Sequence, residues 1–341
     1  MMITVYLVAL TILISFLNIF CMKNNYLISE TGDGHQRFAS KTKTPLTGGI
    51  FIYLSILFFF DYLNISLLIF SLIILILGVI SDLKLIKSAN KRLFFQILIV
   101  LGFIIISDTQ ITDTRINFLN DFLSIKYFNY LFVIFCILIL INGSNFFDGL
   151  NTLNIGYYFF VILIINYLIS NNEIFVSEPQ VYKNLIFILI FVYLLNFTNK
   201  VFLGDSGSYL LGFIFSILLI DLYESNNHIS PFYIILLVWY PCYENLFSII
   251  RKKILNRSTM KPDSNHLHQL IFYFIKKKLS LKISYANLLS ANLINIYNFL
   301  IFLISSSFIS NTKTIIVFIM LNLVVYTVIY YKLFTYRYKK L

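Results

Sequence analysis

Polar side chains that could bind an anion or a metal ion gather in short segments beside long apolar runs. Steps of three place Asn142, Asn145 and Asp148 on one face of a helix end, so their oxygens converge. In segment 199–208, Asp205 stands among two glycines and two serines. Glycine allows close backbone approach, and an aspartate there can hold Mg²⁺ that binds substrate phosphates. These two segments predict a site for phosphate or a hydrated metal ion.

Two further segments carry a carboxylate with cations and a pair of histidines. Asp82 is followed by four cations, an arrangement that a simple basic loop at a membrane surface would also have: Lys84, Lys87, Lys91 and Arg92. His266 and His268 stand two residues apart in a basic stretch. Zinc would require further ligands at suitable spacing, and the sequence offers none. Hydrogen bonding to phosphate oxygens is therefore the favoured role of the two histidines.

The elements that position these residues are apolar helices. The 341-residue chain is 59% hydrophobic and 12% charged, which excludes an ordinary soluble protein. A spanning helix needs about 20 apolar residues, and the apolar runs do not alternate as the strands of a β-barrel would. We expect a single all-α membrane domain over 1–341, with about eleven spanning helices and ten as the alternative. The expected spans are 2–22, 46–60, 65–81, 93–107, 127–145, 153–170, 184–197, 207–221, 232–250, 286–308 and 313–333.

The basic residues sort to one side of this arrangement. The formal net charge is +11, and all but four of the 26 Lys and Arg residues lie in alternate loops. By the positive-inside rule these loops are cytoplasmic, which puts the N-terminus outside. The candidate site residues lie on the same cytoplasmic side of a plasma membrane. The charge therefore does not indicate nucleic acid as a partner. The basic loops are 23–45, 82–92, 142–153, 196–206, 251–283 and the tail from 332.

Taken together, the segments resemble the polyprenyl-phosphate N-acetylhexosamine-1-phosphate transferases of glycosyltransferase family 4. The blocks stand in family order and cover most of the chain. The most specific are Asn-x-x-Asn-x-x-Asp-Gly at 142–149 and Phe-Leu-Gly-Asp-Ser-Gly-Ser at 202–208. The others are 45–49, Asp82 with a basic residue and Gln96 beyond it, and the histidine loop.

The resemblance implies a reaction and its partners. Such proteins transfer a sugar-1-phosphate from a UDP-sugar to undecaprenyl phosphate and release UMP, as the first membrane step of a cell-surface or cell-wall glycan. The resemblance also implies Mg²⁺, with Mn²⁺ as an alternative, contact with membrane lipids, and a homodimer as an open question. The Asp-x-x-His-Leu-His form of the histidine loop favours an N-acetylhexosamine donor.

Residue roles follow from the resemblance by matching position. Asp205 is expected to bind the metal ion, with Asn145 as the second ligand and Asp82 as a further one. Asp148 would belong to the nucleotide-sugar and metal shell, and all three aspartates are expected to be catalytic.

The same matching assigns the substrate contacts. His266 and His268 would be catalytic and bind the pyrophosphate that is broken. Phe202 and Gly204 would help form the uridine pocket, and Arg92 would bind the acceptor phosphate. Further substrate contacts are expected from Asn142 and Lys91.

One departure from the family pattern bears on the activity. Relatives usually have paired aspartates after the third span, whereas this chain has Ser81 before Asp82. A weakly active homologue is therefore one alternative, and a multi-pass transporter or flippase is another. Transporter sites lie near the bilayer midplane, whereas the acidic residues and histidines here fall at the ends of spans.

Overall fold

The computed structural model describes residues 2–29, 43–256 and 264–338, and parts of the basic loops 23–45 and 251–283 and of the tail lie outside them. The described residues form helices and no strand, with one isolated bridge between Ile28 and Pro45. The all-α prediction is confirmed for this part of the chain. The helices are α1 (Met2–Asn24), α2 (Gly48–Ile56), η1 (Leu57–Tyr62), α3 (Ile65–Asp82), α4 (Ala89–Ser107), α5 (Asn117–Leu123), α6 (Lys126–Phe147), α7 (Leu153–Ser170), α8 (Pro179–Phe197), α9 (Gly204–Glu224), α10 (Pro231–Leu237), α11 (Trp239–Ile254), α12 (Leu267–Leu279), α13 (Ile283–Ser306) and α14 (Thr312–Tyr338).

The number of long helices is slightly smaller than the sequence suggests. Among the described residues, nine helices are long and apolar enough to cross a membrane, or ten if α10 and α11 form one broken span bent by 76°. The expected span at 46–60 is instead the nine-residue α2 followed by the 3₁₀ turn η1. That tight turn shortens the regular helix, so this segment is not counted among the nine.

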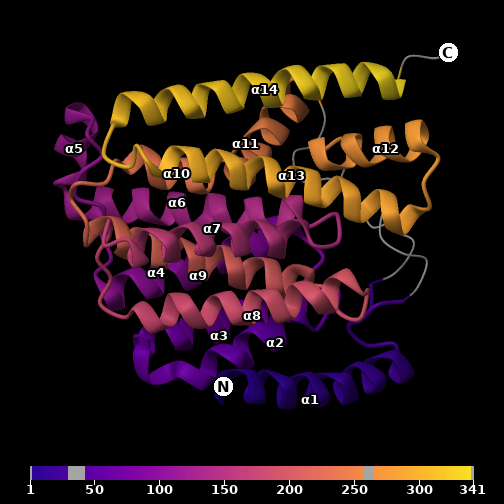
Figure 1. Ribbon diagram of the computed structural model, residues 1–341. Helices are drawn as coiled ribbons and strands as arrows, with labels where there is room; N and C mark the ends of the chain where they lie inside the picture. Colours follow the sequence, from indigo (N-terminus) through magenta and orange to yellow (C-terminus); the bar gives the residue numbers. More distant parts are fainter. Residues whose placement is uncertain (1, 30–42, 257–263, 339–341) are drawn as a thin grey trace.

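Two segments that the sequence analysis treats as loops contain helices. The stretch 251–283 includes α12, and α5 lies between α4 and α6. Figure 1 shows α5 and α12 at opposite ends of the bundle. Both are short, so the search for long apolar runs passes over them.

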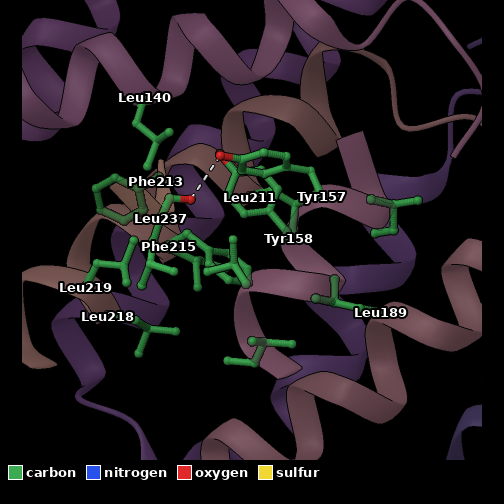
Figure 2. Close-up of a cluster of buried hydrophobic side chains, with 14 of the residues drawn as sticks. Leu140, Tyr157, Tyr158, Leu189, Leu211, Phe213, Phe215, Leu218, Leu219 and Leu237 are labelled. Atoms are coloured by element: carbon green, nitrogen blue, oxygen red, sulfur yellow. Dashed lines mark hydrogen bonds between the residues drawn. The ribbon is translucent and has the colours of Figure 1, made fainter. Parts of the chain in front are cut away.

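The central helix of the bundle is α9. Protein surrounds 94% of its spanning window, and it packs most extensively on α3 and α6. In Figure 1 it lies midway between α1 and α14. Figure 2 shows Phe213 and Phe215 of α9 in the buried cluster, where Tyr158 packs on Phe215 with ring centroids 4.4 Å apart. The neighbouring Tyr157 hydroxyl donates to the Leu237 carbonyl at 3.0 Å. The helix that begins with the predicted metal-binding segment is therefore fixed on all sides.

Close contact between α3 and α9 depends on glycine. A Cβ added at Gly78 would lie 2.3 Å from Ser206 Cα, so any side chain there would push the helices apart. Small residues at such crossings let membrane helices pack backbone to backbone. This crossing brings the end of α3 to the start of α9.

Candidate functional site at the start of α9

Asp82 closes the N-terminus of α9. Its Oδ1 accepts a hydrogen bond from the Asp205 backbone N–H at 2.8 Å, and its Oδ2 accepts one from the Ser206 N–H at 3.0 Å. The first N–H groups of a helix lack partners within the helix, and a carboxylate there also suits the helix dipole. Asp82, the last residue of α3, thus acts as a cap supplied by another helix. From the sequence Asp82 is expected to be a catalytic residue and metal ligand, and the capping role is visible only in the structure.

Gly204 makes the capping arrangement fit. It has φ +68°, in the left-handed region that favours glycine, and it lies against the Asp82 carboxylate. An added Cβ would stand 2.7 Å from Asp82 Oδ2. The glycine expected in the uridine pocket therefore has a structural task at the helix start, and its contact with substrate stays a prediction.

Asp205 lies at the centre of a polar network between α3, α4 and α9. Its Oδ2 accepts hydrogen bonds from Ser81 Oγ at 2.5 Å and from Arg92 at 2.7 Å. Arg92 also donates to Ser81 Oγ at 3.0 Å, and the Tyr209 hydroxyl lies 3.4 Å from Oδ2. The Asp205 and Arg92 side chains remain 22% and 27% exposed. The residue in place of the first family aspartate is thus a direct partner of the predicted metal ligand.

The end of α6 brings Asp148 to the same region. Burial raises the pKa of the Asp148 carboxyl well above its ordinary value, and the charges of Asp205 and Asp82 raise it further. The Ser208 and Asn154 side chains act in the opposite direction. The structure therefore brings together the three aspartates that the sequence predicts, and Asp148 needs a positive partner to stay ionised.

The two asparagines of this block differ in their surroundings. Asn142 donates to Gln96 Oε1 at 3.0 Å, which links α6 to α4 four residues beyond Arg92. Asn145, in the last turn of α6, is partly exposed. Its amide oxygen could serve a ligand, as the sequence predicts.

The histidine loop packs on this end of α6. The His266 ring stacks on Phe146, with centroids 5.7 Å apart, and on His268, with centroids 5.6 Å apart. A Cβ added at Gly149 would stand 2.5 Å from His268 Nε2. Segments more than a hundred residues apart thus meet at one site, as the resemblance implies.

The remaining predicted contacts surround this site. The Phe202 backbone pairs with the chain before α2, because its N–H donates to Pro45 at 2.8 Å and its carbonyl accepts from Gly48 at 2.9 Å. Lys91 is exposed at the start of α4. The proline and glycine segment therefore supports the loop that carries Phe202.

The donor set can be compared with what Mg²⁺ requires. Within residues 2–29, 43–256 and 264–338, no group of three or more His, Cys, Asp or Glu is placed to hold one metal ion. Mg²⁺ usually takes only one or two carboxylates and fills its octahedron with water and phosphate oxygens. In the described part of the chain Arg92 pairs with Asp205, one of three neighbouring aspartates, and a divalent cation would offset the negative charge that remains. The residues present therefore fit Mg²⁺ bound largely through water and phosphate.

Comparison with known proteins shows which family this chain is similar to. Residues 64–223, from just before α3 to the end of α9, match the family model for glycosyl transferase family 4. This block contains Asp82, Asp148 and Asp205, so the segment that carries the three aspartates is similar to that family.

Named relatives make the likeness more specific. A protein of Thermotoga maritima named undecaprenyl-phosphate alpha-N-acetylglucosaminyl 1-phosphate transferase is 26% identical over 83% of this chain and 86% of its own length. A Yersinia pestis protein of the same name is 25% identical over 67% of this chain and 65% of its own. A Bacillus subtilis protein named probable undecaprenyl-phosphate N-acetylglucosaminyl 1-phosphate transferase is 26% identical over 59% of this chain. The match spans 56% of the Bacillus protein.

Proposed function

We propose that the chain transfers an N-acetylhexosamine-1-phosphate from a UDP-sugar to undecaprenyl phosphate and releases UMP. The observation that carries this proposal is that three aspartates and Arg92 lie together at the start of α9, while the stacked histidines pack on Phe146 and Gly149 at the end of α6. The names of the relatives supply the acceptor and the N-acetylglucosaminyl group. The product is the first lipid-linked intermediate of a cell-surface or cell-wall glycan.

The reaction joins two anionic substrates. An oxygen of the acceptor phosphate attacks the phosphorus that carries the sugar, the bond to the bridging oxygen breaks, and UMP leaves with the electron pair. A phosphate monoester with a second pKa near 6 is largely doubly ionised at pH 7, so its oxygen needs little help from a base. Ser81 in place of an aspartate is therefore compatible with activity.

Each group of the site has a task in this step. Bound Mg²⁺, held by Asp205 with Asn145, would neutralise phosphate charge. Arg92, next to Asp205, would orient the acceptor phosphate. His266 and His268 would donate hydrogen bonds to the donor pyrophosphate. Asp82 would keep the start of α9 in place and so position the Asp205 carboxylate.

The placement of the charged residues favours transfer over transport. Asp82 is the last residue of α3, Asp205 is the second residue of α9, and Asp148 follows α6. A transporter would hold its substrate near the middle of the bilayer, commonly at broken helices. By the positive-inside rule, the basic loops favour the cytoplasmic side for this end of the bundle, where a UDP-sugar is available.

The test uses purified protein, undecaprenyl phosphate and a panel of radiolabelled UDP-sugars, with UMP release and lipid products measured. UDP-N-acetylhexosamines should give a lipid-linked pyrophosphate only when Mg²⁺ or Mn²⁺ is present. Asp205→Asn should lower the rate about 100-fold or more, because it removes charge that acts directly on the reacting phosphates.

Asp221→Asn is the matched control, since Asp221 lies near the other end of the same helix. This variant should keep wild-type activity. Full activity of Asp205→Asn would refute the site. Uptake or flipping of a substrate in vesicles without any UDP-sugar would support the transporter instead.

A further inference from the structure

Glu244 of α11 is a buried charge outside the aspartate cluster. Its side chain is 1% exposed. Its Oε1 accepts hydrogen bonds from His266 Nδ1 at 2.9 Å and from the Leu267 N–H at 3.3 Å, and its Oε2 accepts one from the Tyr326 hydroxyl at 2.9 Å. Three donors around one carboxyl group favour its ionised form, which only accepts hydrogen bonds. Burial of such a charge is costly unless a cation pairs with it.

Among the described residues, the basic side chain paired with Glu244 is His266, whose Nδ1 lies 2.9 Å from Oε1, and the pair is ionic when the imidazole is protonated. Later in the same helix, Arg251 donates to the Tyr330 hydroxyl at 2.6 Å, and Lys252 lies over the Phe146 ring on which His266 also stacks. A histidine that carries the positive charge is protonated on both ring nitrogens. With Nδ1 bound to Glu244, its Nε2–H is the second donor.

His266 stands at the proposed transfer site. It stacks on Phe146, which follows Asn145, and on His268, which lies against Gly149. A positively charged ring at this position can donate to a phosphate oxygen and also balance its charge. A neutral ring bound to Glu244 through Nδ1–H would present a lone pair to the phosphate instead.

We infer that Glu244 is a positioning residue for the transfer reaction, one that keeps His266 charged and oriented toward the donor pyrophosphate. Tyr326 ties this pair to α14, the last helix of the chain. The inference rests on the proposed function and adds to it two residues that lie outside the family match of 64–223. Histidines are commonly oriented in this way by a carboxylate on the second ring nitrogen.

Kinetic constants of variants distinguish the effect of the Glu244 charge from the effect of its packing. Glu244→Gln keeps the size of the side chain and removes the charge, so kcat/KM for the UDP-sugar should fall about 10- to 100-fold, the usual effect of losing a carboxylate that orients a histidine. The KM for undecaprenyl phosphate should not change. Glu244→Asp keeps the charge and should stay within about fivefold of wild type, and so should Tyr326→Phe, which removes one neutral hydrogen bond. Equal losses in Glu244→Gln and Tyr326→Phe would overturn the inference.

A spectroscopic measurement tests the charge without any turnover. The chain has only four histidines, so ¹⁵N-histidine labelling gives few signals, and His266→Asn assigns the one of interest. At pH 7.5 the wild-type ring should have both nitrogens protonated, and Glu244→Gln should convert it to a neutral tautomer. A neutral His266 in the wild type, or an unchanged charge in Glu244→Gln, would overturn the inference.

The kinetic and ¹⁵N measurements also distinguish a failure of the proposed function from a failure of the positioning role of Glu244. If no UDP-sugar is turned over by the wild type, the proposed function fails, whereas the ¹⁵N signals still decide whether Glu244 holds the His266 charge. If transfer occurs and Glu244→Gln keeps full kcat/KM, the proposed function stands and the positioning role is wrong.

Discussion

Replacing Asp82 by alanine should destabilise the whole bundle, because its carboxylate caps α9 from α3. The change leaves the N–H groups of Asp205 and Ser206 without their partner. A hydrogen bond to a charged group contributes about 1.5–3 kcal/mol, so two of them amount to about 3–6 kcal/mol. The neighbouring charges of Asp205 and Asp148 repel Asp82, which moves the expected loss toward the lower end of that range. Asp82→Asn keeps one acceptor oxygen and should lose about half as much.

The free energy of unfolding can be measured by SDS titration in mixed micelles with far-UV circular dichroism, in EDTA so that no divalent ion contributes. Asp221→Asn, on the same helix, should change stability by less than about 0.5 kcal/mol, as for a substitution away from such contacts. If Asp82→Ala in EDTA falls within 1 kcal/mol of wild type, which is below the energy of one charged hydrogen bond, then Asp82 does not hold the helix start and the capping argument is wrong.

Three further changes test the surroundings of Asp205. Ser81→Asp places a second carboxylate beside Asp205, so the Mg²⁺ concentration for half-maximal UMP release should fall about tenfold. An unchanged or higher Mg²⁺ concentration would contradict a metal ion at this position. Arg92→Lys keeps the charge but loses the planar guanidinium, so the KM for undecaprenyl phosphate should rise more than the KM for the UDP-sugar. A larger rise in the KM for the UDP-sugar would assign Arg92 to the donor. Gly204→Ala puts a Cβ at a positive φ and against Asp82, so the free energy of unfolding in the same SDS titration should fall by about 1–2 kcal/mol or more. Wild-type stability of this variant would show that the start of α9 can adapt to a side chain.

The sequence predicts the location of the site well because the residues of the site occupy short segments at the ends of apolar runs. Carboxylates at span ends must lie at the end of the bundle, and the repeated steps of three set the Asn142, Asn145 and Asp148 face. The structure places Asp82, Asp148 and Asp205 in one region. The Mg²⁺ and substrate roles stay predictions.

What the sequence could not predict depends on contacts between distant helices. Nothing in the segment around Asp82 says that both of its oxygens face the start of α9, or that Ser81 binds Asp205. The link from Glu244 to His266 and Tyr326 joins α11, the histidine loop and the last helix. A glutamate in an otherwise apolar run was the one available signal, and it had no partner in the sequence. The bend between α10 and α11 was missed because apolar residues continue through it.

Burial of α9 on all sides has a consequence for how the chain assembles during synthesis. Its strongest packing partners, α3 and α6, precede it in the chain, so they can already be in the bilayer when α9 leaves the ribosome. Membrane helices first insert and then associate. Its apolar surface then need face lipid only briefly before neighbouring helices enclose it. Asp205, in the first turn of α9, would thus meet a site whose other residues lie on helices that are already in the bilayer.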